Sequence, residues 1–167
     1  MDETRRAGEA PLPLAVRLAR EKASAVALQH PDAWVIGSDQ VAVREAGSAA
    51  ETILGKPGTE ADCIEQLRGC SARTVSFLTA VAVVRHTAGA MHEFADTTRV
   101  TFRRLDDAAI SRYVALEAPF DCGGGFKSEG LGIALCKSID SVDPSALIGL
   151  PLIELSDVLR RVGFDLP

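Results

Sequence analysis

Two long β-prone runs separated by a short turn constrain this chain more than any other feature of its sequence. Thr74–Arg85 and Met91–Phe102 are rich in Val, Thr and Phe, which favour extended strands. The segment Thr87–Ala90 between them contains Gly89 and is short enough to be a hairpin turn. The pattern predicts one long antiparallel strand pair, against which the rest of the chain must pack.

The remaining pattern alternates between helices and strands, which predicts an α/β fold with a mixed, twisted sheet and flanking helices. Apolar residues at helical spacing predict helices over residues 12–29, 59–68, 106–117 and 151–163, and short apolar runs predict strands at 33–36 and 133–138. Val41–Val43 is a candidate extension of the first strand, and 144–150 is expected to be a short turn or helix. The order of the strands does not follow from this pattern. The helical core positions expected are Ile64, Leu67, Ile110, Tyr113, Val114, Leu152, Leu155, Leu159 and Val162.

Length and charge limit the class of protein. A chain of 167 residues with 47% apolar residues is expected to form one domain, residues 1–167, with a sizeable core. Its net charge of -5 argues against a nucleic-acid partner but allows a small phosphorylated ligand, which needs only a local group of cations. We expect no secretory signal, no membrane partner and a cytoplasmic location, because no apolar run approaches the length of a bilayer span. The four cysteines lack metal-site spacing and are interpreted as small apolar residues.

Asp39 is the first candidate for chemistry. It follows the apolar run Ala33–Ile36 within Gly37–Gln40, and a carboxylate at the end of a strand lies at the edge of the sheet where ligands usually bind. Such a carboxylate can hold a divalent cation or accept a proton from water. The alternative is that Asp39 caps a turn, and the pattern alone does not decide between the two.

Two lysines are weaker candidates. Lys56 lies in the stiff loop Gly55–Gly58, where its ammonium could meet a phosphate, although most loop lysines are simply solvated. This loop is not a Walker A motif, whose glycine spacing is longer. Lys22 follows Leu18 by four residues and borders the apolar face of its helix, so an ordinary helix charge with its stem along the core is the better interpretation of that residue alone.

The most unusual stretch is Cys122–Gly130, which contains three consecutive glycines. Such a run costs backbone entropy and indicates either a tight turn or close approach of the backbone to a ligand. Lys127 and Glu129 share a face if the chain is extended, and this pair of charges suits a phosphate or the edge of a base. No nucleophile, histidine and acid occur in a catalytic order, so carboxylates with lysines favour metal-assisted phosphate chemistry.

Six ordered blocks of sequence resemble the Maf family from Asp2 to the C-terminus. The resemblance implies a two-lobed architecture with a central cleft, similar to that of the ITPase fold. It also implies hydrolysis of a nucleoside triphosphate to monophosphate and pyrophosphate with Mg²⁺ or Mn²⁺. The blocks are Asp2–Thr4, Arg20–Ala23, Val35–Val41, Leu54–Gly58, Phe126–Gly130 and Leu147–Leu152.

The branch of the family is indicated by two blocks. Ser38-Asp39-Gln40 and Lys127-Ser128-Glu129-Gly130 look like the branch that prefers 7-methyl-GTP rather than dTTP or UTP. Carried over by resemblance, Asp39 is the proton acceptor, and Glu3, Lys22 and Lys56 are the metal and phosphate contacts. Glu3 and Asp39 are the implied metal ligands, and Gln40, Lys127 and Glu129 are tied to the choice of base. The resemblance also implies a homodimer.

One part of the family pattern is absent. Members of the family begin with a strand and a Ser-x-Ser-x-Arg-Arg loop before the Asp-Glu pair that Asp2-Glu3 matches, and Arg5-Arg6 follows that pair instead. We therefore expect a form truncated at its N-terminus, with the first strand missing and a sheet edge exposed. Two alternatives to a 7-methyl-GTP pyrophosphatase stay open at this point: a nucleotide-binding remnant without turnover, and an enzyme acting on dTTP or UTP.

Overall fold

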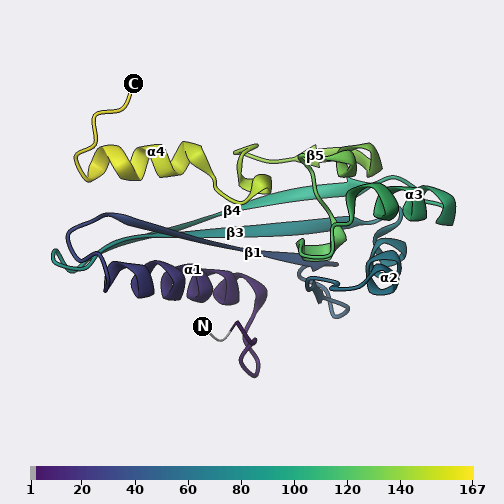
Figure 1. Ribbon diagram of the computed structural model, residues 1–167, viewed down its shortest axis with the longest axis horizontal. Helices are drawn as coiled ribbons and strands as arrows, with labels where there is room; N and C mark the ends of the chain where they lie inside the picture. The colour runs from purple at the N-terminus through teal and green to yellow at the C-terminus, as the bar shows by residue number, and fades with distance from the viewer. Residues whose placement is uncertain (1–2) are drawn as a thin grey trace. The chain divides into compact units, whose positions relative to one another are not determined.

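The computed structural model describes residues 3–167 and confirms the α/β class (Figure 1). Five strands form one sheet in the order β2-β1-β3-β4-β5. The pairs β1–β2 and β4–β5 are antiparallel. The elements in chain order are α1 (Pro11–Ala27), β1 (Val35–Arg44), β2 (Thr52–Leu54), α2 (Glu60–Cys70), β3 (Thr74–Arg85), β4 (Ala90–Phe102), α3 (Asp107–Glu117), the 3-10 turns η1 (Gly123–Gly125) and η2 (Leu131–Leu135), β5 (Cys136–Asp140), the 3-10 turn η3 (Ala146–Ile148) and α4 (Leu152–Arg161).

The long hairpin is confirmed to within one residue at each boundary. β3 and β4 are joined by the four residues 86–89, and Gly89 adopts a φ of 58° in that turn. β3 is buried along almost its whole length, whereas the first half of β4 alternates between half-buried and exposed residues. This difference follows from the sheet order, because β3 is the central strand and must pack on both of its faces.

The chain divides into two compact units. The first runs to Gln40 and also contains Leu78–Thr97 and Val142–Pro167. Within it, α1 and α4 lie on opposite sides of the strands (Figure 1). Val81 and Val83 of β3 pack against Leu155 and Val158 of α4, with four partly buried apolar residues around them. These contacts bury the apolar face of α4.

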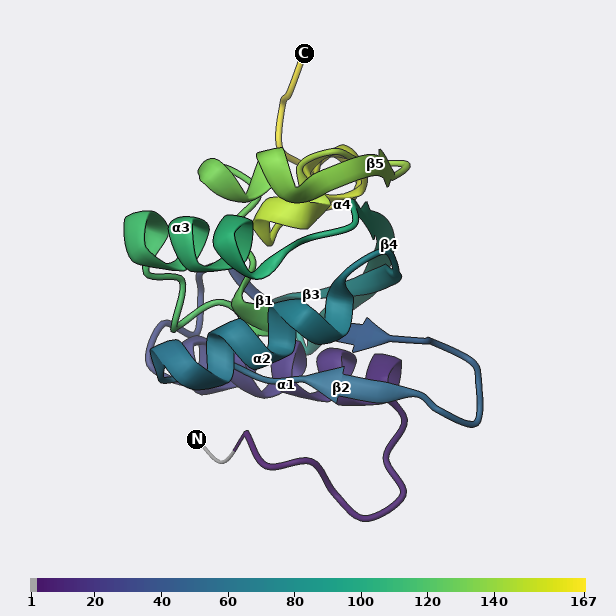
Figure 2. The same ribbon diagram turned by 90° about the vertical axis from the view of Figure 1, so that its right-hand side faces the viewer.

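The second unit comprises Val41–Phe77 and Thr98–Ser141. In it α2 packs against α3, and the two helices lie side by side in Figure 2. The ring of Phe126 lies tilted against that of Phe77, with centroids 5.6 Å apart, and edge-to-face against that of Phe102, with centroids 5.2 Å apart. Aromatic contacts at this separation contribute beyond the area that they bury.

The helix starts follow the expected capping chemistry. Thr59 caps α2 by accepting a hydrogen bond from the Asp62 backbone N–H at 3.2 Å, and Asp106 caps α3 through the Ala109 N–H at 2.7 Å. Ile110, Tyr113 and Val114 are buried on α3 as expected. Leu67 is buried on α2, but Ile64 is only half-buried, because Cys63 and Cys70 occupy the core positions beside Leu67. All four cysteines are free thiols.

One expectation about β1 was wrong in a way that affects the site. The strand was expected to end at Gly37–Gln40, but it runs without interruption for ten residues, so that Asp39 lies in the middle of β1. Gly37 was the first residue of the segment at which the strand was expected to end. The glycine is instead required by packing, because a Cβ there would lie 2.5 Å from the backbone oxygen of Ala19 and 2.6 Å from the nitrogen of Ala23 on α1.

Two smaller expectations also need correction, and one strand was not expected. Ile133 lies in the 3-10 turn η2 rather than in a strand, and β5 starts at Cys136, where pairing with Phe102 of β4 begins. The short strand β2 was not expected at all. On α4, Leu152 is 51% exposed, and the buried face is formed by Leu155 and Val158. Within residues 3–167, no helix combines the length and apolar character needed to cross a membrane.

Candidate functional site

A lysine and two carboxylates meet in the first unit. The Lys22 Nζ lies 2.5 Å from Asp39 Oδ1 and 3.0 Å from Glu3 Oε1. The side chain of Asp39 is only 11% exposed, whereas Lys22 and Glu3 are 34% and 51% exposed. The structure therefore brings together three of the residues that the resemblance singled out. Asp2, which belongs to the same sequence block as Glu3, lies outside the described residues.

The approach of α1 to β1 explains this meeting. Gly37 faces α1 and leaves room for the helix backbone at Ala19 and Ala23. Asp39 follows Gly37 by two residues on the same strand, so it points to the same face of the sheet. Lys22 precedes Ala23 on the helix and reaches Asp39 across this close contact. Lys22 is thus the ion-pair partner of two carboxylates, which its interpretation as an ordinary helix charge with its stem along the core did not include.

The charges of this cluster determine what it can hold. Partial burial lowers the pKa of Lys22, but the hydrogen bonds to Asp39 and Glu3 outweigh burial and raise that pKa overall. Among residues 3–167, no group of three or more His, Cys, Asp and Glu side chains could hold a metal ion. Two carboxylates converging on one cation nevertheless fit Mg²⁺, which proteins usually hold with one or two carboxylates, substrate phosphates and water.

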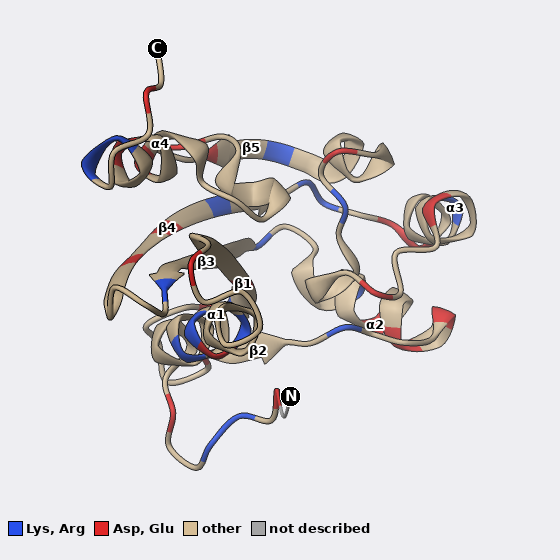
Figure 3. Cartoon of the chain, turned by 60° about the vertical axis from the view of Figure 1, so that its left-hand side comes forward, with Lys and Arg blue, Asp and Glu red and all other residues tan. Residues whose placement is uncertain are grey.

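Arg17 holds the segment that carries Glu3 against α1. Its guanidinium contacts both oxygens of Glu9, at 2.7 and 2.9 Å, and donates to the backbone oxygen of Thr4 at 3.1 Å. The side chains of Arg17 and Glu9 are each 11% exposed. Figure 3 shows the mixture of basic and acidic residues along α1. A bidentate pair with so little exposure fixes geometry well, so this pair holds the segment next to Glu3 in place.

The Arg17–Glu9 pair gives a prediction for acid stability. The hydrogen bond from Arg17, followed by that from the Arg6 backbone N–H, lowers the pKa of Glu9 from 4.5 to about 2. A lowered folded-state pKa contributes stability above pH 4.5 that is lost as the pH falls from 4.5 towards 2. We expect Glu9→Gln to flatten this part of the stability curve, measured by urea unfolding at several pH values. Glu154→Gln, on α4, is the control. Equal slopes for the parent and Glu9→Gln would contradict the assignment.

Ser38 and Gln40 flank Asp39 and hold a turn near the C-terminus. Ser38 Oγ lies 2.6 Å from the carbonyl oxygen of Gly149 and 3.1 Å from that of Ala80. Gln40 Nε2 donates to Thr79 Oγ1 at 2.8 Å and lies 3.1 and 3.2 Å from the carbonyl oxygens of Ala146 and Leu147. Gln40 was expected to determine the choice of base. In the structure its amide nitrogen contacts the backbone oxygens of η3.

In the second unit, the loop that carries Lys56 is tied to the glycine-rich stretch. Gly58 N donates to the Phe120 carbonyl at 2.9 Å, and Gly124 N donates to the Gly55 carbonyl at 3.1 Å. These bonds fix both ends of the loop and leave Lys56 itself exposed. Gly124 and Gly125 adopt positive φ angles of 71° and 63°, which explains the need for glycine there.

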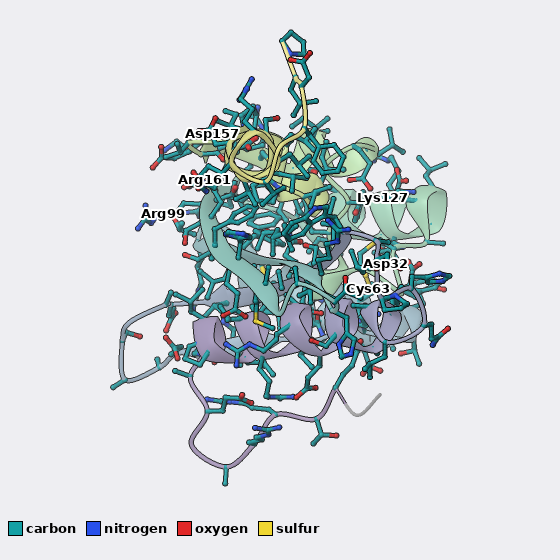
Figure 4. The ribbon with its side chains drawn as sticks, turned by 90° about the vertical axis from the view of Figure 1, so that its left-hand side faces the viewer. Asp32, Cys63, Arg99, Lys127, Asp157 and Arg161 are labelled. Carbon is teal, nitrogen blue, oxygen red and sulfur yellow. The ribbon has the colours of Figure 1, made fainter. Side chains whose placement is uncertain are left out.

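Lys127 and Glu129 follow the three glycines of this stretch in the same unit. Lys127 Nζ pairs with Glu117 Oε1 at 3.2 Å, beside α3 (Figure 4). Glu129 is exposed, and its Oε2 lies 3.3 Å from Ser128 Oγ. Three residues with structural tasks at these sites were missed from the sequence: Glu117, Arg17 and Thr79. Only Arg17 carried a local signal, its spacing of four residues from Glu21 on one helix.

Comparisons with known proteins identify the family of this chain. The chain belongs to the Maf family, because the family model described as Maf-like protein matches residues 1–162. It is also similar to several proteins named 7-methyl-GTP pyrophosphatase. One from Alkalilimnicola ehrlichii is 51% identical over 99% of this chain and 81% of that protein. Others are 47% identical in Alcanivorax borkumensis, over 100% of this chain and 82% of the relative, and 52% identical in Xanthomonas oryzae pv. oryzae, over 100% and 84%.

Proposed function

We propose that this protein is a nucleotide pyrophosphatase that hydrolyses 7-methyl-GTP to the monophosphate and pyrophosphate. The observation that carries the proposal is the ion-paired cluster of Glu3, Lys22 and Asp39. Relatives named for this reaction are about half identical to this chain. The alternatives acting on dTTP or UTP, or lacking turnover, have no such support.

The reaction needs a group that accepts a proton from water. We assign this role to Asp39, whose carboxylate is mostly shielded from solvent but held at a fixed place on β1. As water attacks the α-phosphorus, its oxygen forms the new P–O bond, the bond to the oxygen bridging the α- and β-phosphorus atoms breaks, and pyrophosphate leaves. The proton lost by the water goes to Asp39. A base positioned in this way contributes a factor of about 10²–10⁴ to the rate.

Cationic side chains offset the charge of the phosphates. Lys22 is held by two carboxylates, so its ammonium has a fixed direction. Lys56 is exposed on a loop fixed at both ends, and Lys127 is held by Glu117. Ammonium groups held in place before the reaction stabilise developing negative charge without reorganising. Following the family resemblance, we assign Lys22 and Lys56 to phosphate contacts and Lys127 to the choice of base.

A divalent metal ion would complete the chemistry. Glu3 and Asp39 would hold Mg²⁺ or Mn²⁺, which would supply Lewis-acid polarisation of phosphate oxygens. Both residues provide the hard carboxylate oxygens that these ions prefer. Gln40 and Glu129 remain the proposed determinants of base choice. A homodimer, a cytoplasmic location and a lack of nucleic-acid and membrane partners stay predictions from the sequence.

The proposal is tested by measuring pyrophosphate release from 7-methyl-GTP, GTP, dTTP and UTP in the presence of Mg²⁺ or Mn²⁺. We expect 7-methyl-GTP to have the largest kcat/KM and chelation with EDTA to abolish turnover. Faster turnover of dTTP or UTP would place the protein in the other branch of substrates. Binding of nucleotides without release of pyrophosphate, with either metal, would contradict the proposed activity.

A further inference from the structure

Glu117 holds two points of the segment that carries the proposed base determinants. It is the last residue of α3, and its side chain is only 13% exposed. Oε1 lies 3.2 Å from Lys127 Nζ, and Oε2 accepts a hydrogen bond from the Leu131 backbone N–H at 2.7 Å. One carboxylate therefore spans the segment 127–131, with one oxygen at each end.

Two neighbouring residues, Gly130 and Tyr113, support the contacts of Glu117 with this segment. A Cβ on Gly130 would lie 2.5 Å from both carboxylate oxygens, so the glycine leaves the space that the carboxylate fills. One helical turn earlier, the Tyr113 hydroxyl accepts from Lys127 N at 3.0 Å and lies 3.3 Å from the Gly125 carbonyl. The same face of α3 thus fixes the start of the segment through Tyr113 and its end through Glu117.

The negative charge of Glu117 contributes to both of these contacts. The Leu131 N–H, and after it the Lys127 ammonium, lower the pKa of Glu117, so the carboxylate is ionised at neutral pH. The ammonium of Lys127 is drawn towards α3, and Glu129 lies between the two anchored points. Because the residues on both sides of Glu129 are fixed, its side chain has fewer accessible conformations. The entropy cost of ordering this side chain on a ligand is therefore lower.

We propose that Glu117 is a positioning residue that sets the nucleotide preference of this protein by fixing Lys127 and the segment up to Leu131. This inference rests on the proposed pyrophosphatase function. Glu117 is not required to touch the nucleotide. It acts through Lys127 and through the backbone that carries Glu129, and small errors of position in such groups cost about a hundredfold in rate.

A double-mutant cycle tests this dependence. Glu117→Gln keeps an oxygen for the Leu131 N–H but removes the charge opposite Lys127. We expect it to lower kcat/KM for 7-methyl-GTP by about tenfold to a hundredfold, and for dTTP by much less, so that the preference between the two falls. In a Lys127→Met background, the same change should have almost no further effect. Additive effects, or equal losses for all nucleotides, would overturn the proposal. Asp107→Asn, at the other end of α3, serves as the matched control and should leave the preference unchanged.

A second measurement does not depend on turnover. Amide hydrogen exchange at Leu131 should accelerate at least tenfold in Glu117→Ala, remain close to the parent rate in Glu117→Gln, and remain unchanged in Asp107→Asn. Parent-like exchange in Glu117→Ala would refute the anchoring role even in a fully active protein. If instead exchange responds as expected while the parent releases no pyrophosphate from any nucleotide, the proposed function fails and the anchoring of this segment stands.

Discussion

Replacing Asp39 with asparagine is expected to lower kcat for 7-methyl-GTP by about 10²–10⁴-fold, because an amide cannot accept the proton of the attacking water. Asparagine has nearly the same shape, and β1 is held at this point by packing against α1 and by pairing within the sheet. The loss should therefore appear in kcat rather than in the yield of folded protein. Steady-state release of pyrophosphate, with circular dichroism as a check of folding, measures it.

The control for this prediction is Asp157→Asn, the same chemical change at an exposed residue of α4. Asp157 pairs with Arg160 one turn along the same helix, and its side chain is 57% exposed. Asp157→Asn should retain the parent fold, since exposed ion pairs of this kind contribute little to stability. It should also retain the parent kcat, because Asp157 is not one of the proposed site residues. An Asp39→Asn protein with more than a tenth of the parent kcat would show that another group accepts the proton.

Gly37→Ala is expected to destabilise the protein by about 1–3 kcal/mol, the usual cost of overpacking a filled interior. The added Cβ would lie 2.5 Å from the Ala19 oxygen and 2.6 Å from the Ala23 nitrogen. Both are backbone atoms of a helix, so they cannot move aside as the end of a flexible side chain would. Urea unfolding should show a lower midpoint with an unchanged m-value.

Gly55→Ala is the matched control, because a Cβ at Gly55 meets nothing within 4 Å. It should be neutral or slightly stabilising, by less than about 1 kcal/mol, through the smaller entropy of the unfolded chain. Gly37→Ala should also lower turnover, since α1 carries Lys22 towards Asp39 at this contact. A Gly37→Ala protein as stable as the parent would mean that α1 is not held against β1 as described.

The elements that could be predicted from the sequence are those decided locally. The hairpin of β3 and β4 and the capped starts of α2 and α3 depend on neighbouring residues, and their boundaries were correct to within one or two positions. β1 could not be predicted correctly, because Gly37 reads as a strand breaker until the helix that packs on it is known. The strand order and the short strand β2 depend on contacts between distant segments, which spacing alone does not encode.

The same distinction applies to the site. Asp39 stood out through its place after an apolar run, and its role as proton acceptor stays a prediction from the family resemblance. Lys22 and Asp39 are 17 residues apart, and only the packing of α1 on β1 shows that they form a pair. Glu117 could not be found from the sequence, because its partners Lys127 and Leu131 follow the three glycines and become its neighbours only after η1 has turned the chain.

The hydrogen bonds of Gln40 have a consequence for attempts to redesign this protein. Its amide nitrogen faces the Thr79 hydroxyl and two backbone oxygens of η3. A glutamate at this position would bring an anion against those oxygens, and an apolar residue would remove the donor to Thr79 Oγ1 and to the Leu147 carbonyl. An engineer who changes residue 40 to alter the base would therefore also weaken the contact between β1 and η3. A library for new nucleotide specificity should therefore vary Gln40 together with Thr79 and residues 146–149, and select for folding before selecting for rate.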